Sequence, residues 1–121
     1  MIAILLGKGF EESEALVPAD LLRRAGAQVL LVGLDSLQVT GSHGITVTAD
    51  TTLAELDRDS VQMLMLPGGL GGVAAIAGSN HAQALIQYCW DQGRWLAAIC
   101  AAPTILARMG ILDRRNAVCY P

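Results

Sequence analysis

Apolar residues occur along this chain in short continuous runs rather than in strict alternation with polar residues. Four runs are unbroken and a fifth is interrupted; they stand at Ile2–Leu6, Gln28–Gly33, Val39 with Ile45–Thr48, Met63–Leu66 and Trp95–Ile99. Continuous runs of this length are typical of strands buried on both faces, as in a parallel sheet covered by helices. The pattern therefore predicts five strands.

Helical patterns lie between these runs. The first, Glu11–Ala25, has acidic residues in its first turn, arginines in its last turn, and Gly26 at the position of a C-terminal cap. Pro18 lies inside this stretch and removes one backbone hydrogen bond, so we expect the helix to kink or to begin late.

Two further helices and a hairpin complete the pattern. One helix is predicted from His81 to Gln92, and another opens at Ala101 with Pro103 in its first turn, where the missing N–H has no cost. The turn-forming residues of Thr40–Gly44 predict a hairpin. The alternation of strands and helices predicts a flavodoxin-like three-layer α/β sandwich, with residues 1–121 as a single domain.

The last residues of the chain look like the beginning of another element. Asn116–Tyr120 is predicted to start a strand, and a domain of this architecture normally continues with further strands and a covering helix. We therefore expect a C-terminal remainder of the same polypeptide to complete the sheet.

Composition narrows the class of partner. The chain is 53% hydrophobic and 16% charged, with a net charge of −3 and no basic stripe, which argues against nucleic acid. A mean hydropathy of +0.46 is high for a domain of this size, so we expect the chain to bury apolar surface on both faces of its sheet or to share some of it with a partner. Ile2–Leu6 is too short to span a membrane, and three cysteines without a Cys-x-x-Cys motif fit free thiols in the cytoplasm. Nothing in the sequence calls for a cofactor or a metal.

Cys100 is the strongest candidate for chemistry. It stands where the apolar run Trp95–Ile99 meets a predicted helix, and it is followed by the small residues Ala101 and Ala102. This arrangement is typical of a nucleophile elbow, in which the side chain projects over the carboxyl end of the sheet. The helix N-terminus favours the thiolate form of such a cysteine. The alternative is a buried and inert cysteine, which is common in apolar runs.

Two other strand ends offer groups to such a thiolate. Leu66-Pro67-Gly68-Gly69 places paired glycines after a strand, where an exposed N–H could join that of Ala101 in an oxyanion hole; the alternative is an ordinary glycine turn. Gly7–Glu14 is a glycine loop before a helix, but it lacks the spacing of a phosphate-binding loop, and its carboxylates would repel phosphate. Acidic first turns usually only complement the helix dipole, yet one of these carboxylates could share a proton with the cysteine.

Taken together, these elements resemble the ThiJ/PfpI superfamily, in the branch of the bacterial ThiJ-type proteins and the Parkinsonism-associated deglycase. The resemblance covers nearly the whole chain and rests on four linked motifs: Gly9-x-Glu11-Glu12-x-Glu14, Pro18-x-Asp20-x-x-Arg23-Arg24-Ala25-Gly26, Leu66-Pro67-Gly68-Gly69 and Ala97-Ala98-Ile99-Cys100-Ala101-x-Pro103. It implies a homodimer and an elbow cysteine prone to sulfinic oxidation. It also implies that Glu14 is a protonated acid hydrogen-bonded to the sulfur, and that Gly69 and Ala101 are the oxyanion-type donors.

Two positions depart from the family pattern. Tyr120 stands before Pro121 where better-known members often have a histidine, so a Cys–His dyad is not supported. The hairpin arginine that the family's dimer often donates to the neighbouring site is replaced by His43, while its own-chain companion matches Arg24. The resemblance therefore implies an anion pocket that is weaker or pH-dependent, although a histidine in a turn is more often simply solvated.

The resemblance implies two functions that share these residues. One is a cysteine-dependent glyoxalase or deglycase, in which Cys100 attacks a methylglyoxal-type carbonyl, Glu14 moves the proton, and Gly69 and Ala101 bind the oxyanion. The other is an oxidative-stress sensor or holding chaperone that works through oxidation of Cys100. A role in thiazole synthesis follows only from the family name, and no residue carries it.

Overall fold

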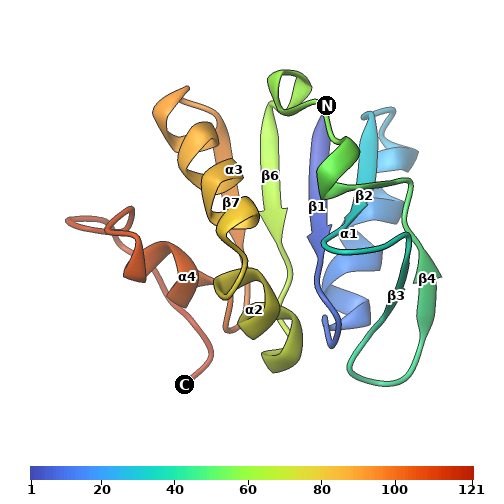
Figure 1. The fold of residues 1–121 in the computed structure, drawn as a ribbon. Coiled ribbons are helices and arrows are strands. Elements are labelled where there is room, and N and C mark those ends of the chain that lie inside the picture. The colour runs from blue at the N-terminus through green and yellow to red at the C-terminus, as the bar shows by residue number, and fades with distance from the viewer.

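The structure is a computed structural model that describes residues 1–121, and its centre is a five-stranded, all-parallel sheet. The strands are β1 (Ile2–Leu6), β2 (Val29–Gly33), β5 (Thr51–Thr52), β6 (Met63–Leu66) and β7 (Trp95–Ala98), in the order β5-β2-β1-β6-β7. Figure 1 shows α1 behind the sheet and α2, α3 and α4 on the other side. The predicted flavodoxin-like α/β sandwich is confirmed.

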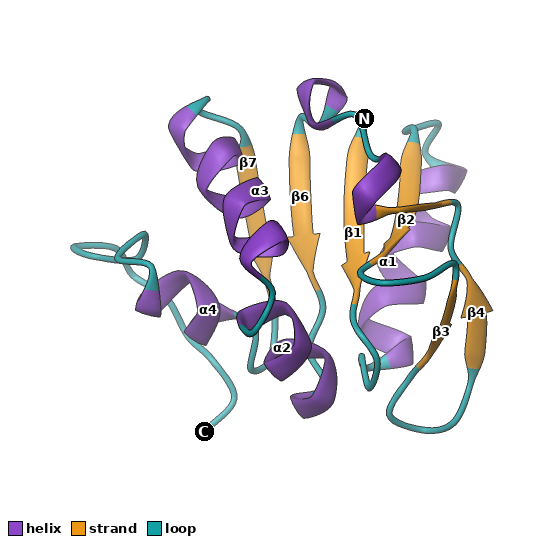
Figure 2. Ribbon diagram, viewed as in Figure 1, coloured by secondary structure: helices purple, strands orange, loops and turns teal.

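Helices of different length cover the two faces. They are α1 (Glu12–Arg24), α2 (Leu70–Ala77), α3 (Asn80–Asp91) and α4 (Pro103–Arg108), with two short 3₁₀ turns at Leu53–Glu55 and Arg58–Ser60 (Figure 2). The N-terminus of α3 is capped by the Ser79 side chain, which accepts a hydrogen bond from the N–H of Ala82 at 3.1 Å. No helix is long and apolar enough to cross a membrane.

Successive residues of each central strand enter different cores. Ala3 and Leu5 pack with α2, α3 and α4, whereas Ile4 and Leu6 pack with α1 on the opposite face. All four side chains are at most 1% exposed. The continuous apolar run of β1 is thus explained by burial on both faces of the sheet.

The prediction that Val39 and Ile45–Thr48 form a strand of the main sheet is wrong. The two segments form a separate antiparallel pair, β3 (Gln38–Thr40) and β4 (Thr46–Thr48), joined by the predicted hairpin turn. The fifth strand of the main sheet is instead β5, which pairs in parallel with the end of β2. Two threonines carry no apolar pattern of their own, so this edge strand is defined only by its pairing.

Three smaller expectations also differ from the structure. The first helix begins at Glu12 and runs through Pro18, so it does not start late. The sequence pattern gave no sign of α2, because Gly71 and Gly72 lie in its first turn and glycine has low helix propensity. Asn116–Tyr120 forms no strand; these residues are exposed, and the N–H of Tyr120 donates to the carbonyl of Cys100 at 2.7 Å.

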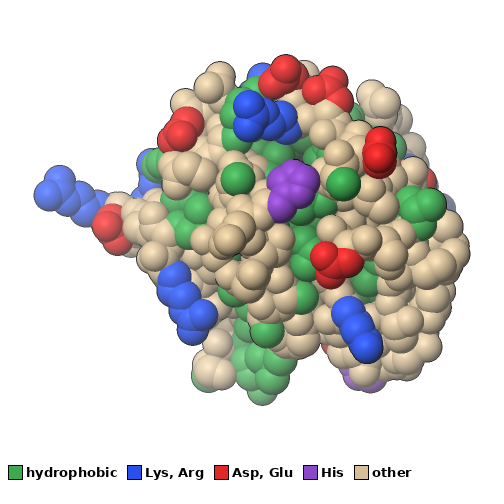
Figure 3. Space-filling view, in the orientation of Figure 1, with side chains coloured by type: hydrophobic (Ala, Val, Ile, Leu, Met, Phe, Trp, Pro, Cys, Tyr) green, Lys and Arg blue, Asp and Glu red, His purple; other side chains and the backbone are tan.

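Charged groups are scattered over the visible surface. In Figure 3 the lysines and arginines lie apart from one another, between acidic side chains, and do not form one basic patch on that face. Apolar side chains are exposed elsewhere, notably Val17 and Leu21 on α1, which are 53% and 59% exposed.

Candidate active site

The sheet order fixes where the site lies. The chain leaves β1 towards β2 on one side and later returns to add β6 and β7 on the other, so the order reverses between β1 and β6. In open parallel sheets, ligands bind beyond the carboxyl ends of the strands at such a switch point. The loops after β1, β6 and β7 carry the three predicted elements of the site and meet at this edge.

Cys100 lies two residues after the end of β7, in a strained backbone conformation. Its φ is 61°, a left-handed value that an L residue with a Cβ adopts only at a cost of about 1–2 kcal/mol. The predicted nucleophile elbow is confirmed in this respect. The thiol is half-buried, and Ala102 and Pro103 follow where α4 begins, with proline in the first turn as expected.

Gly68 brings the carboxylate of Glu14 next to the sulfur. Its N–H donates to Oε2 of Glu14 at 2.8 Å, and a Cβ on this glycine would overlap that same oxygen. The same Cβ would lie 2.5 Å from Cβ and 3.1 Å from Sγ of Cys100. The side chains of Glu14 and Cys100 therefore border the same small space. This space is empty because Gly68 has no side chain.

The hydrogen bond of Glu14 differs from the one that the family resemblance implies. No bond joins Glu14 to Sγ; the carboxylate accepts from the Gly68 N–H instead, because that donor lies directly beside Oε2. The Glu14 side chain still lines the pocket that contains Cys100.

The two predicted oxyanion donors have free N–H groups. Neither Gly69 nor Ala101 donates a backbone hydrogen bond within the chain. Gly69, with a φ of 89°, lines the pocket and precedes α2, whereas Ala101 is 7% exposed and does not line it. Sequence reasoning missed Gly68 as a site residue, although the paired glycines after a strand were a signal for it.

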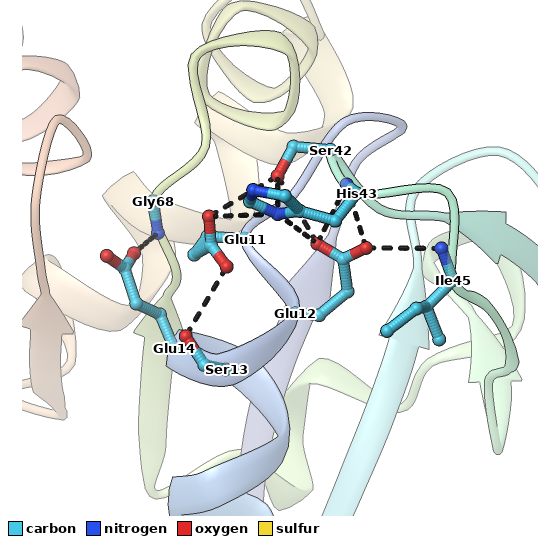
Figure 4. A network of polar contacts seen from close by, with 8 residues as sticks. All are labelled: Glu11, Glu12, Ser13, Glu14, Ser42, His43, Ile45 and Gly68. Atoms are coloured by element: carbon cyan, nitrogen blue, oxygen red, sulfur yellow. Dashed lines mark hydrogen bonds and ion pairs between the residues drawn. The ribbon is translucent and has the colours of Figure 1, made fainter.

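Glu12 is the buried first residue of α1, and its carboxylate binds the hairpin. Its two oxygens accept hydrogen bonds from the N–H groups of His43 and Ile45 and from the Ser42 hydroxyl, at 2.9–3.2 Å (Figure 4). Gly41 makes room for it, since a Cβ there would overlap the Glu12 carboxyl group. Glu12 thus has a structural role, while Glu11 and Glu14 line the pocket.

Burial alone would raise the pKa of Glu12, but hydrogen bonds outweigh it. The N–H groups of Glu12 itself, Ile45 and His43, together with the His43 ring, lower this pKa from 4.5 to about 2. The hydrogen bonds therefore favour the ionised carboxylate.

We expect this carboxylate to make stability depend on pH. Because the folded pKa lies below the ordinary one, the contribution is fully present above pH 4.5 and is lost as pH falls through about 2. Denaturant titrations of the native chain and of Glu12→Gln should differ most near neutral pH, and the difference should shrink below pH 4.5. A difference that stays constant through this range would contradict the assignment.

The two predicted anion-binding residues do not reach the pocket. Arg24 is the last residue of α1, which starts at the edge of the site and runs back along the sheet. It therefore lies about 18 Å along the helix axis from Glu12, the first residue of that helix. It pairs with Asp20 at 2.9 Å, and an anion-binding role for Arg24 in a dimer stays a prediction. His43 is 69% exposed and lies beside Glu12 and Glu11, with Nδ1 at 3.3 and 3.5 Å from their oxygens.

Glu11, Glu12 and His43 form a cluster of possible cation ligands. Their ligand atoms lie within 4.8 Å of one another. The Glu12 oxygens are already occupied by hairpin N–H groups, however, so this cluster stabilises the turn without an ion.

Comparison with known proteins agrees with this geometry. The model of the DJ-1/PfpI family matches residues 1–121. The chain belongs to the DJ-1/PfpI family. The resemblance inferred from the motifs is thereby confirmed.

Individual relatives match nearly the whole of this chain but only part of their own length. The Drosophila melanogaster protein dj-1beta is 39% identical over 119 residues, which are 98% of this chain and 64% of that protein. Deglycase TK1284 of Thermococcus kodakarensis is 32% identical and is matched over 69% of its length. The solved structure of Toxoplasma gondii DJ-1, oxidized, superimposes with a TM-score of 0.94 at 33% identity, covering 99% of this chain and 66% of that one. The chain thus spans about two thirds of the length of these relatives.

Proposed function

We propose that this chain carries the active-site face of a cysteine-dependent glyoxalase or deglycase that acts on methylglyoxal-type carbonyl adducts. The observation that carries the proposal is the convergence of Glu14 and Cys100 on the point left free by Gly68. A nucleophile and a proton-transfer group within one pocket meet the first requirement of such chemistry. Relatives that bear the name deglycase support the same reaction class.

The proposed reaction uses this chain's residues in sequence. The Cys100 thiolate attacks the aldehyde carbon of methylglyoxal, and the electron pair of the carbonyl moves to its oxygen, where the N–H groups of Gly69 and Ala101 are free to donate. Protonation of that oxygen gives a hemithioacetal. Glu14 then removes the proton from the former aldehyde carbon and returns it to the neighbouring carbon, while the hydroxyl proton passes to the oxygen of that neighbouring carbon, which yields a thioester. Water hydrolyses the thioester to lactate and restores the thiol.

The alternative function is a redox sensor or holding chaperone. The half-buried Cys100 and the nearby carboxyl group favour it, because a protonated Glu14 would also stabilise a sulfinate. A related structure is titled as oxidized DJ-1. The same residues support both functions, so turnover is the measurement that separates them.

Two partners belong to this proposal. We propose that a second copy covers α1 near the exposed Val17 and Leu21, together with the hairpin, and that a C-terminal remainder of the polypeptide completes the sheet beside β7. Assays of function should therefore use the longest native form of the polypeptide.

We expect that form to convert methylglyoxal to lactate. The product is measured enzymatically, with methylglyoxal alone and with its adduct on N-acetylarginine as substrates. Alkylation of Cys100 beforehand should stop lactate formation, because the attacking sulfur is blocked. Cys119→Ser is the matched control: this second free thiol is exposed and does not line the pocket, so the variant should keep full activity. Absence of lactate, or lactate formation that survives alkylation of Cys100, would rule out the enzyme.

A further inference from the structure

The pocket over Cys100 is negatively charged. It has a volume of about 510 Å³, and its only charged lining residues are Glu11 and Glu14. The remaining walls come from glycines, Ser42, Leu70 and Tyr120. No lysine, arginine or histidine lines it.

Glu11 is held in place at the pocket wall. Its side chain is 25% exposed, and one of its oxygens accepts a hydrogen bond from the Ser13 hydroxyl at 3.3 Å. The other lies 3.3 Å from the Ser42 hydroxyl, whose single proton is shared with Glu12. Figure 4 shows Glu11 drawn between Glu14 and the cluster of Glu12 and His43. The Glu11 carboxylate therefore lies at the wall of the pocket that contains the sulfur of Cys100.

The basic groups of the chain do not neutralise this charge from inside the pocket. Lys8 is exposed and lines a different depression, and Arg24 is paired with Asp20 at the far end of α1. His43 Nδ1 lies 3.5 Å from Glu11, but the ring is largely exposed to solvent and also contacts the Glu12 carboxylate.

We propose that Glu11 is a specificity-determining residue, and that this pocket admits uncharged or positively charged carbonyl compounds and excludes anionic ones such as α-oxo carboxylates. The proposal rests on the proposed function, because it names the class of substrate for the same cysteine. An anion that approaches Sγ must come close to Glu11 in a partly dehydrated site, where like charges repel more strongly than in water. Uncharged dicarbonyls and cationic adducts on amino groups meet no such barrier.

A matched pair of alkylating reagents tests the charge of the pocket without any turnover. Iodoacetamide and iodoacetate react in the same way: sulfur forms a bond to the CH₂ carbon and iodide leaves. They differ only in that one carries an amide and the other a carboxylate. The rate at each cysteine is followed by mass spectrometry of peptides, at low salt to limit screening.

Cys119 supplies the reference within the same molecule. It is exposed, whereas Cys89 is buried. We expect the ratio of the iodoacetamide rate to the iodoacetate rate to be about tenfold higher at Cys100 than at Cys119. Glu11→Gln should bring the two ratios to within about twofold, and Glu55→Gln, at an exposed glutamate in a distant 3₁₀ turn, should change nothing.

Equal ratios at Cys100 and Cys119 in the native chain would overturn the proposal, and this comparison needs no variant. A raised ratio that survives Glu11→Gln would also overturn it, because the charge would then belong to another residue. If the ratio behaves as expected but no lactate is formed, the proposed function fails and the charge selectivity stands.

Discussion

Gly68→Ala should lower turnover at least about a hundredfold while leaving the fold intact, because displacement of a catalytic group by about 1 Å has an effect of this size. The new methyl group would overlap Oε2 of Glu14 and lie 2.5 Å from Cβ of Cys100. Cys100 is fixed by the end of β7 and the backbone before α4, so Glu14 must yield. Its carboxylate then leaves the sulfur, and proton transfer is lost. Lactate formation measures the effect, and thermal unfolding verifies that the variant is folded.

Gly78→Ala is the control for this prediction. Gly78 ends α2 with a φ of −83°, so alanine fits its backbone, and the nearest atom to a new Cβ is the Ala74 carbonyl oxygen at 3.3 Å. This variant should retain turnover. Full activity in Gly68→Ala would show that the point shared by Glu14 and Cys100 is not where the reaction takes place.

The sequence predicts the central sheet well because burial on both faces leaves a strong signal. The runs at Ile2–Leu6 and Met63–Leu66 coincide with β1 and β6 residue for residue. The elbow was equally predictable, since an apolar run that ends at Cys100 before small residues requires a sharp turn. The edge strand Thr51–Thr52 was not, because its position depends on hydrogen bonds to β2 and not on its own side chains.

The roles of the three glutamates show what a local pattern leaves undecided. Glu11, Glu12 and Glu14 occupy one helical turn, and the pattern marks all three as acids near the sheet edge. Only the tertiary structure sends Glu12 to a hairpin some 30 residues away and Glu14 to the Gly68 N–H. The hairpin accepts Glu12 because Gly41 has no side chain, which is a contact distant in sequence.

The position of Arg24 shows a second limit of a local pattern. It was assigned to the site by the resemblance of a motif, without regard to the direction of the helix. A helix that follows a parallel strand must run back along the sheet, so its last turn lies at the opposite edge from the site. Arg24 therefore lies away from the pocket of its own chain, and its anion-binding role in a dimer stays a prediction.

Two substitutions of Cys100 should abolish turnover equally but differ in stability, because the backbone at this residue is strained. Cys100→Gly and Cys100→Ala both remove the sulfur, and turnover should fall at least about a thousandfold in each, as for other nucleophiles. Glycine adopts a φ of 61° without strain, whereas alanine retains it. Cys100→Gly should therefore be more stable than Cys100→Ala by about 1 kcal/mol, measured from denaturant midpoints.

Ala102→Gly provides a control of opposite sign two residues further along the chain. Ala102 has a helical φ of −63° and is fully buried, so glycine there should destabilise the fold by about 1 kcal/mol or more. Equal stability of the two Cys100 variants would mean that the left-handed conformation is not strained in solution. If the expected order is found, glycine is the more stable residue for the backbone conformation at position 100. The chain has cysteine there at a cost in stability, because the reaction needs a sulfur atom over the pocket.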